Sequence, residues 1–120
     1  MTPLATGFKR GQVRLANLNP AKGSEPGKTR PCLIIQCDAL NDADHPSTIV
    51  MPLTSQVLGN GAPLRFHVPR RDNIAVDSDV LIDQIKAIDN GRFVGSILTV
   101  LTEPELIVID ERLRILVGES

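Results

Sequence analysis

The apolar residues of this chain fall in short runs that glycine and proline repeatedly interrupt, and this pattern constrains the fold more than any other feature. Nine glycines and nine prolines are spread over 120 residues, which favours turns over long helices. Strand-like runs occupy 12–18, 32–37, 48–53, 64–68, 79–88 and 96–101, and the fifth leaves room for a bend. Polar residues at 40–47 indicate a loop. We therefore expect one mainly β domain over 1–120, with a small barrel or a strongly bent sheet.

Near the end of the chain, the apolar residues repeat with a different spacing. Thr102 precedes Pro104 and Glu105, which is the arrangement of a capping box at the start of a helix. Apolar residues then recur at spacings of three and four, as on one face of a helix: Leu106, Ile109, Leu113 and Leu116. The sequence predicts one C-terminal amphipathic helix that covers a face of the sheet.

Cysteine usage and hydropathy bear on the cellular compartment. Cys32 and Cys37 are five residues apart, so on one strand their side chains point to opposite faces and cannot form a disulfide bond. No further Cys or His pair completes a zinc site, and we expect neither metal nor cofactor. No apolar run reaches membrane-spanning length, and the first ten residues lack the apolar stretch of a signal peptide. We expect a cytoplasmic protein with reduced thiols and no membrane partner.

Charge is distributed unevenly along the chain. Residues 1–71 contain nine Lys and Arg against four Asp and Glu, a net charge of +5, whereas residues 72–120 carry −6. Such asymmetry is a sign that one face meets an anion, although two differently charged solvated surfaces would give the same count. Three Phe are the only aromatic residues, which argues against a stacking platform for single-stranded nucleic acid.

Polar residues at the ends of the apolar runs are candidates for chemistry. The loop at 19–31 carries three cations and ends at Arg30, where a guanidinium held rigidly at a strand base suits two phosphate oxygens. Thr54 and Ser55 follow the third strand, and their hydroxyls can donate to a phosphate. Asp83 interrupts an apolar run, and burying it would require a partner. A purely structural pair between Arg30 and Asp83 is therefore an alternative to a catalytic role.

Several short segments occur in a specific order: Leu18-Asn19-Pro20, Lys22-Gly23-Ser24-Glu25, Thr29-Arg30-Pro31, Leu53-Thr54-Ser55-Gln56 and Asp83-Gln84-Ile85-Lys86-Ala87-Ile88-Asp89. Together they resemble the MazF/PemK (Kid) family of toxin endoribonucleases of type II toxin–antitoxin systems, over nearly the whole chain. The resemblance implies an SH3-like, PemK/CcdB-like barrel, a homodimer and inhibition by an acidic, MazE-like antitoxin. It also implies sequence-specific, metal-independent cleavage of single-stranded mRNA to 2′,3′-cyclic phosphate and 5′-hydroxyl ends.

The resemblance also implies roles for particular residues. By motif position, Arg30 matches the catalytic arginine and Thr54 the catalytic threonine of the family, while Glu25 and Asp83 match carboxylates near the reaction. RNA contacts are expected from polar residues that flank these positions: Lys22, Gly23, Ser24, Lys28, Ser55, Gln56 and Gln84.

Two other functions stay open. One is a catalytically inactive barrel that binds RNA or protein without cleaving it. The other is a gyrase-inhibiting, CcdB-like toxin, but the C-terminal Trp-Gly-Ile of that family is absent because the chain has no Trp. His45 and His67 match no family position, so we expect both at the surface and disfavour a ribonuclease built on two histidines.

Overall fold

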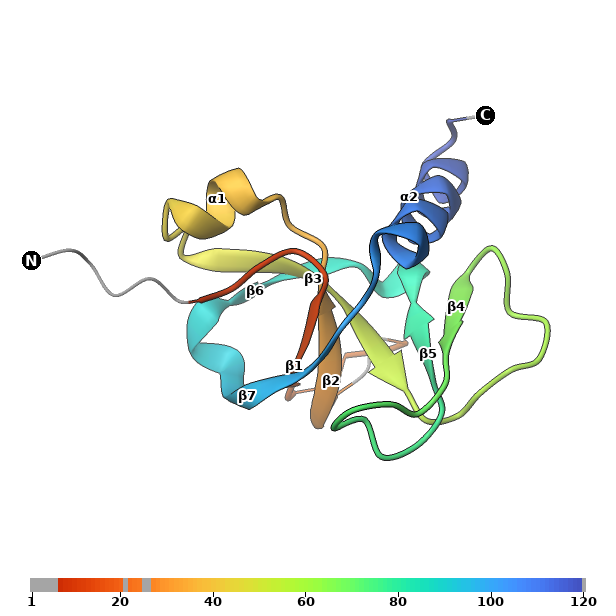
Figure 1. Ribbon diagram of the computed structural model, residues 1–120, viewed down its shortest axis with the longest axis horizontal. Helices are drawn as coiled ribbons and strands as arrows, with labels where there is room; N and C mark the ends of the chain where they lie inside the picture. Colours follow the sequence, from red (N-terminus) through yellow and green to blue (C-terminus); the bar gives the residue numbers. More distant parts are fainter. Residues whose placement is uncertain (1–6, 21, 25–26, 120) are drawn as a thin grey trace, which may run out of the picture.

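Seven short strands form one antiparallel sheet in the computed structural model, which describes residues 7–20, 22–24 and 27–119 (Figure 1). The strands are β1 (Gln12–Asn17), β2 (Thr29–Ile34), β3 (Ser47–Thr54), β4 (Arg65–Val68), β5 (Ser78–Leu81), β6 (Lys86–Asp89) and β7 (Phe93–Val100). Their order in the sheet is β4-β5-β3-β2-β1-β7, and β6 pairs separately with β3.

Strand β3 bends the sheet because its partners change along its length. Its first half pairs with β6, where Ile49 lies opposite Ala87, and its last two residues pair with β5. On the other side, the pairing of β1 with β7 shifts register next to Arg14. Such irregularities increase the local twist of a sheet. The strongly bent, barrel-like sheet that the sequence predicts is confirmed.

Buried apolar side chains form one cluster on each face of the sheet. Because successive residues of a strand point to opposite faces, Leu33 of β2 belongs to one cluster, and Cys32 and Ile34 belong to the other. The cluster around Leu33 is covered by the C-terminal helix α2 (Glu103–Leu116). This two-sided burial explains why the sequence of β2 is apolar without alternation.

Helix α2 begins at the predicted capping box. The backbone N–H of Thr102 donates to the Glu105 carboxylate at 2.8 Å, and the Thr102 hydroxyl accepts the N–H of Glu105. Such a cap stabilises a helix by about 1 kcal/mol. The predicted apolar face packs on the sheet, as expected: Leu106, Ile109, Leu113 and Leu116. No helix in the described part of the chain is long and apolar enough to cross a membrane.

The segment predicted as a loop at 40–47 is partly helical. A short helix, α1 (Asp38–Asp42), packs beside the sheet because the buried side chain of Asn41 donates to the Gln36 carbonyl at 3.1 Å. Strand β2 also ends earlier than predicted, so Cys37 is exposed before α1 rather than within a strand.

The apolar run at 79–88 is not one straight strand. Strand β5 ends at Leu81, a 3₁₀ turn η1 (Ile82–Gln84) follows, and β6 then pairs with the other half of β3. A second 3₁₀ turn, η2 (Asn90–Arg92), leads from β6 into β7. The bend within 79–88 is confirmed, and it places the polar residues of η1 at the surface.

Candidate active site

Arg30 and Thr54, the two residues that the motifs mark most strongly, lie on the neighbouring strands β2 and β3. Strands β2 and β3 are antiparallel, with Cys32 opposite Pro52. Arg30 precedes Cys32 by two residues on β2, and Thr54 follows Pro52 by two residues on β3, just beyond the last pair of the ladder. Residues two apart on a strand point to the same face, so the guanidinium and the hydroxyl belong to one face of the sheet.

Local hydrogen bonds orient both side chains. Thr54 is only 8% exposed, and its Oγ1 accepts the backbone N–H of Gln56 at 3.2 Å. Arg30 is half-buried, and its Nε donates to the Gly27 carbonyl at 2.9 Å. A guanidinium held at Nε has its two Nη groups fixed in direction, and these are the groups that can bind a phosphate as a fork.

Two clefts meet at this pair. We call the first the Ser55 cleft; its volume is about 520 Å³, and Lys28 and Ser55 are among the residues that line it. We call the second the Asp83 cleft; its volume is about 390 Å³. Three residues line both clefts: Arg30, Thr54 and Gln56. The two clefts therefore share Arg30 and Thr54, for which we predict catalytic roles, and Gln56, for which we predict an RNA contact.

Most of the predicted site residues come together in these two clefts. Eight of them contribute to the lining: Ser24, Lys28, Arg30, Thr54, Ser55, Gln56, Asp83 and Gln84. Lys22 instead lines a separate pocket beside β6, and Gly23 is exposed, has φ +54° and lines none of the three. Glu25 lies outside the described residues. The roles assigned to all eleven residues stay predictions.

The alternative of a structural pair between Arg30 and Asp83 is wrong. The turn η1 leaves the Asp83 side chain exposed, so no buried charge needs to be neutralised there. Within the described ranges, the ion pairs closer than 4.0 Å do not include Arg30 with Asp83. Both residues still line the same cleft, so the carboxylate faces the space beside the guanidinium.

The sequence analysis missed the buried acid of this region, Asp79 on β5. Its side chain is 1% exposed, and its carboxylate accepts hydrogen bonds from the Leu58 N–H at 2.9 Å, Arg65 at 3.2 Å and His67 Nδ1 at 3.0 Å. Burial by itself would raise the pKa of Asp79, but these three bonds together hold it below its ordinary value of 3.8. The sequence signal for this buried acid was an aspartate within an otherwise apolar strand.

The Asp79 network supports the loop that follows Thr54. Arg65 donates both to Asp79 and to the Gln56 carbonyl, the latter at 2.7 Å, and Asp79 accepts the N–H of Leu58. Thr54 and Asp79 are also paired residues of β3 and β5. His67 is at the surface, as predicted, but it also bonds this buried acid. The network therefore holds the backbone at 56–58, from which Gln56 lines both clefts and Leu58 lines the Asp83 cleft.

Metal and thiol chemistry have little support in this region. Within the described ranges, no three His, Cys, Asp or Glu side chains are grouped so that they could hold a metal ion. Cys32 is buried and Cys37 exposed, and neither forms a disulfide. Burial raises the pKa of the Cys32 thiol to about 12, although the charges of Lys86 and Arg30 act in the opposite direction. Cys32 is therefore a protonated neighbour of the site, not a nucleophile.

Comparison with known proteins gives a consistent result. The family described as PemK-like, MazF-like toxin of type II toxin–antitoxin systems matches residues 9–117. The endoribonuclease MazF of Staphylococcus epidermidis is 37% identical over 114 residues, which are 92% of this chain and 92% of that protein.

Solved structures show the same fold. The crystal structure of MazF (Form-I) from Deinococcus radiodurans superposes with a TM-score of 0.77, at 24% identity, over 92% of this chain and 96% of that one. The MazE–MazF structure (Form-II) from the same organism gives a TM-score of 0.72, at 21% identity, over 94% and 97%. The expected mainly β fold with a C-terminal helix is thereby confirmed.

Proposed function

The chain belongs to the family of PemK-like, MazF-like toxins of type II toxin–antitoxin systems, and we propose that it is an endoribonuclease that cleaves single-stranded mRNA at specific sequences. The relative from Staphylococcus epidermidis, which matches nearly the whole chain, is an endoribonuclease. Because mRNA is the proposed substrate, the proposed place of action is the cytoplasm.

One observation carries this proposal: Arg30 and Thr54, on the neighbouring strands β2 and β3, both line the same two clefts. A phosphate seated at this junction would meet a forked cation and a hydroxyl from two adjacent strands. Both residues lie within strands, Arg30 in β2 and Thr54 as the last residue of β3, so the sheet holds their backbones. Preorganised donors of this kind stabilise a transition state more than a ground state.

The proposed reaction uses the chemistry of RNA itself. The 2′-oxygen attacks the adjacent phosphorus as a base removes its proton, and negative charge develops on the phosphorane oxygens. The bond from phosphorus to the 5′-oxygen then breaks, and that oxygen takes a proton. The products are a 2′,3′-cyclic phosphate and a 5′-hydroxyl. Arg30 would stabilise the phosphorane, worth about 2–4 kcal/mol for one well-placed donor, and Thr54 would position a phosphate oxygen or the 2′-hydroxyl.

Two carboxylates are the candidates for the proton transfers of this reaction. Asp83 lines the same cleft as Arg30 and its side chain is exposed there, so it is placed to exchange a proton with a bound RNA. Glu25, the other predicted carboxylate, lies outside the described residues. We propose Asp83 and Glu25 as the acid and base. Substituting each residue separately tests which of them is the acid and which is the base.

Two protein partners belong to the proposal. The first is an acidic antitoxin: the related Deinococcus radiodurans structure holds MazE with MazF, and the cations of the clefts suit a polyanionic segment. The second is another copy of this chain. Three apolar side chains of the sheet-edge strand β7 are exposed, namely Val94 at 45%, Ile97 at 37% and Val100 at 54%, and a dimer would cover them.

The test is cleavage of a defined transcript by the purified protein in the presence of EDTA. We expect discrete fragments whose 5′ ends share a short sequence and need phosphorylation before ligation, because each carries a 5′-hydroxyl. An Arg30→Ala and Thr54→Ala double variant, purified in the same way, controls for contaminating ribonucleases. Fragments that persist with this double variant, or 5′-phosphate ends, would contradict the proposal. Tight RNA binding without cleavage would favour the inactive barrel.

A further inference from the structure

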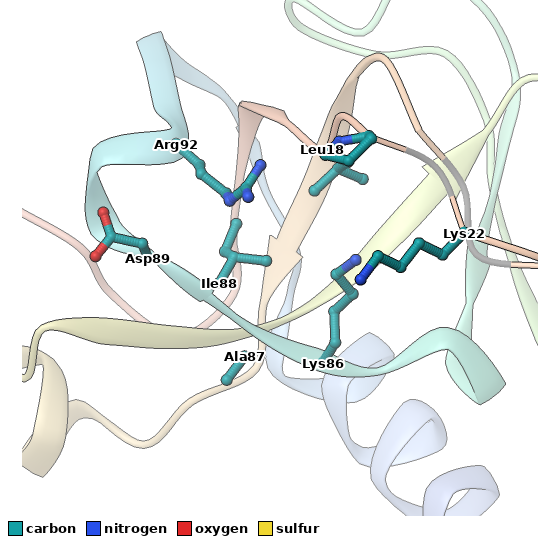
Figure 2. A pocket seen from close by; sticks show the side chains of 8 residues that line it. Leu18, Lys22, Lys86, Ala87, Ile88, Asp89 and Arg92 are labelled. Carbon is teal, nitrogen blue, oxygen red and sulfur yellow. The ribbon is translucent and has the colours of Figure 1, made fainter.

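A separate pocket lies beside β6, on the face of the sheet that carries Arg30 and away from helix α2. We call it the Lys86 pocket; its volume is about 450 Å³, within the range of sites that bind small polar molecules. Its lining combines three cations with an apolar floor: Lys22, Lys86 and Arg92 with Leu18, Pro20, Ala87 and Ile88, together with Asp89. Figure 2 shows the side chains of Lys22 and Lys86 extending toward each other across it.

Arg92 is fixed at the rim of this pocket by the backbone and not by an acid. Its Nη1 donates to the carbonyl of Asn17 at 3.0 Å and to the carbonyl of Asn19 at 2.7 Å. Carbonyl oxygens orient a guanidinium but leave its positive charge uncompensated. In the part of the chain that the structure describes, no carboxylate lies within 4.0 Å of Arg92.

The one acid among the lining residues, Asp89, is engaged by the backbone. Asp89 accepts the backbone N–H of Gly91 at 2.8 Å and so caps the turn η2. Figure 2 shows its carboxylate turned away from Lys22, Lys86 and Arg92. The lining therefore sets three cationic side chains beside an apolar surface, the combination that suits a phosphate attached to a ribose and a base.

The pocket and the candidate active site lie on neighbouring strands. Strand β3 pairs with β2, which carries Arg30, and with β6, which carries Lys86. Cys32 follows Arg30 by two residues on β2. Lys86 on β6 lies opposite Val50 of β3, the strand that lies between β6 and β2. A strand of RNA with one phosphate at Arg30 would therefore reach the Lys86 pocket with another phosphate.

We propose that the Lys86 pocket binds a phosphodiester of the RNA strand other than the scissile one, with Lys22, Lys86 and Arg92 as its ligands. The proposal rests on the proposed function, because it assigns a second contact to the same substrate. It makes these residues binding groups that anchor the strand and leave the chemical step to Arg30 and Thr54. Their removal should raise Kd and KM and leave kcat nearly unchanged.

The experiment uses a short RNA that contains the mapped cleavage sequence, with 2′-deoxyribose before the scissile phosphate so that it binds without being cut. For Lys22→Gln with Lys86→Gln, we expect Kd to rise roughly tenfold and the dependence of log Kd on log salt to fall by about 0.7 for one lost phosphate contact. Arg114→Gln, on the exposed end of α2, removes one cation elsewhere and is the control, with Kd unchanged.

Replacing single phosphates of this RNA by uncharged methylphosphonates locates the contact. At one position outside the scissile bond, the replacement should weaken binding of the wild-type protein several-fold and have a much smaller effect on the double Lys variant, which keeps only Arg92 as a ligand. At every other position, the loss of affinity from the methylphosphonate and the loss from the double Lys substitution should add. Additive losses at all positions, or a Kd unchanged by the double substitution, would overturn the proposal. So would a double variant that loses affinity only for an acidic antitoxin, because the pocket would then serve a protein carboxylate.

The outcomes separate this proposal from the proposed function. If the wild-type protein cleaves RNA and the double variant binds it equally well, only the pocket assignment fails. If the wild-type protein binds RNA without cleaving it, the endoribonuclease proposal fails, and the Kd measurements still decide the role of the pocket. If the wild-type protein does neither, both proposals fall together.

Discussion

The guanidinium of Arg65 lies 3.2 Å from the buried carboxylate of Asp79, and the same guanidinium holds the Gln56 carbonyl at the edge of the candidate active site. A carboxylate that is 1% exposed loses nearly all of its hydration, so its partners must replace the lost hydrogen bonds. They do so with groups from the loop at 56–58 and from β4. The stability of the sheet edge and the shape of the clefts therefore depend on one buried charge.

Removing that charge should destabilise the protein strongly. Asp79→Asn leaves Arg65 and the Leu58 N–H without their anionic partner, and we expect the free energy of unfolding to fall by about 2–4 kcal/mol. The matched control is Asp42→Asn, which breaks the exposed pair with Lys9 at 2.6 Å and should change stability little. Urea denaturation at neutral pH measures both. Equal losses of unfolding free energy in the two variants would show that burial does not make the Asp79 ion pair more stabilising than an exposed pair.

The lowered pKa of Asp79 predicts how that stability depends on pH. A carboxyl whose pKa is lower in the folded state stabilises the protein above its unfolded pKa, near 3.8 here, and loses this contribution as the pH falls through the folded value. The difference in unfolding free energy between wild type and Asp79→Asn should therefore be constant above about pH 5 and shrink below pH 4. Denaturation series across this range check it, and a difference that grows on acidification would reverse the assigned sign.

The parts of the fold that the sequence predicts are those whose signals are local. The capping box at Thr102 and Glu105 sits within four residues, and the helix begins there because those groups bond each other. Helix α1 escaped prediction because Asn41 is held by Gln36 and is buried against the sheet, a tertiary effect that overrides a polar, loop-like sequence.

The candidate site likewise has some features with local sequence signals and others that only tertiary contacts create. The motifs single out Arg30 and Thr54 one at a time, but only the pairing of β2 with β3 brings them to the same two clefts. The Asp79 network was beyond reach, because its three donors come from Leu58, Arg65 and His67, and nothing in the sequence says that they meet at one carboxylate. The Arg30–Asp83 pair was wrong because a turn, not a strand, carries Asp83.

We expect RNA and the cognate antitoxin to compete for this protein. Both are polyanions, and residues 1–71, which supply Lys28 and Arg30 to the clefts, carry a net charge of +5. An acidic, partly disordered tail can occupy a cationic groove and fold as it binds. Added antitoxin should displace a labelled, uncleavable RNA, and both affinities should weaken as salt rises. A ternary complex with unchanged RNA affinity would rule out a shared surface.

We expect the protein to be a homodimer in solution. Light scattering at micromolar concentration should give twice the chain mass of 13.0 kDa. Val94→Lys with Val100→Lys places two charges on the exposed edge of β7 and should yield monomers if that edge is covered in the dimer. Leu40→Lys, on α1, is the control for an exposed apolar side chain elsewhere. A monomeric wild-type protein would remove the dimer from the proposed function.

The roles of Arg30 and Thr54 are tested by substitutions that separate charge from geometry. Arg30→Lys keeps the positive charge but loses the planar fork and its Nε bond to the Gly27 carbonyl. If Arg30 stabilises the phosphorane, the single-turnover cleavage rate should fall by roughly 10²–10³-fold, while RNA binding weakens much less, because the interaction strengthens only in the transition state. Thr54→Ala should also slow cleavage.

The folded state of these variants decides how a slow rate is interpreted. Arg30 has no buried acid to neutralise, since Asp83 is exposed, so Arg30→Lys and Arg30→Ala should both melt within a few degrees of wild type. Arg114→Lys, an exposed position on α2, controls for the loss of an arginine elsewhere and should leave the rate unchanged. A slow Arg30→Lys variant with a normal melt would support transition-state stabilisation. A normal rate for Arg30→Lys would remove Arg30 from the catalytic assignment, because a point charge would then serve as well as a fork.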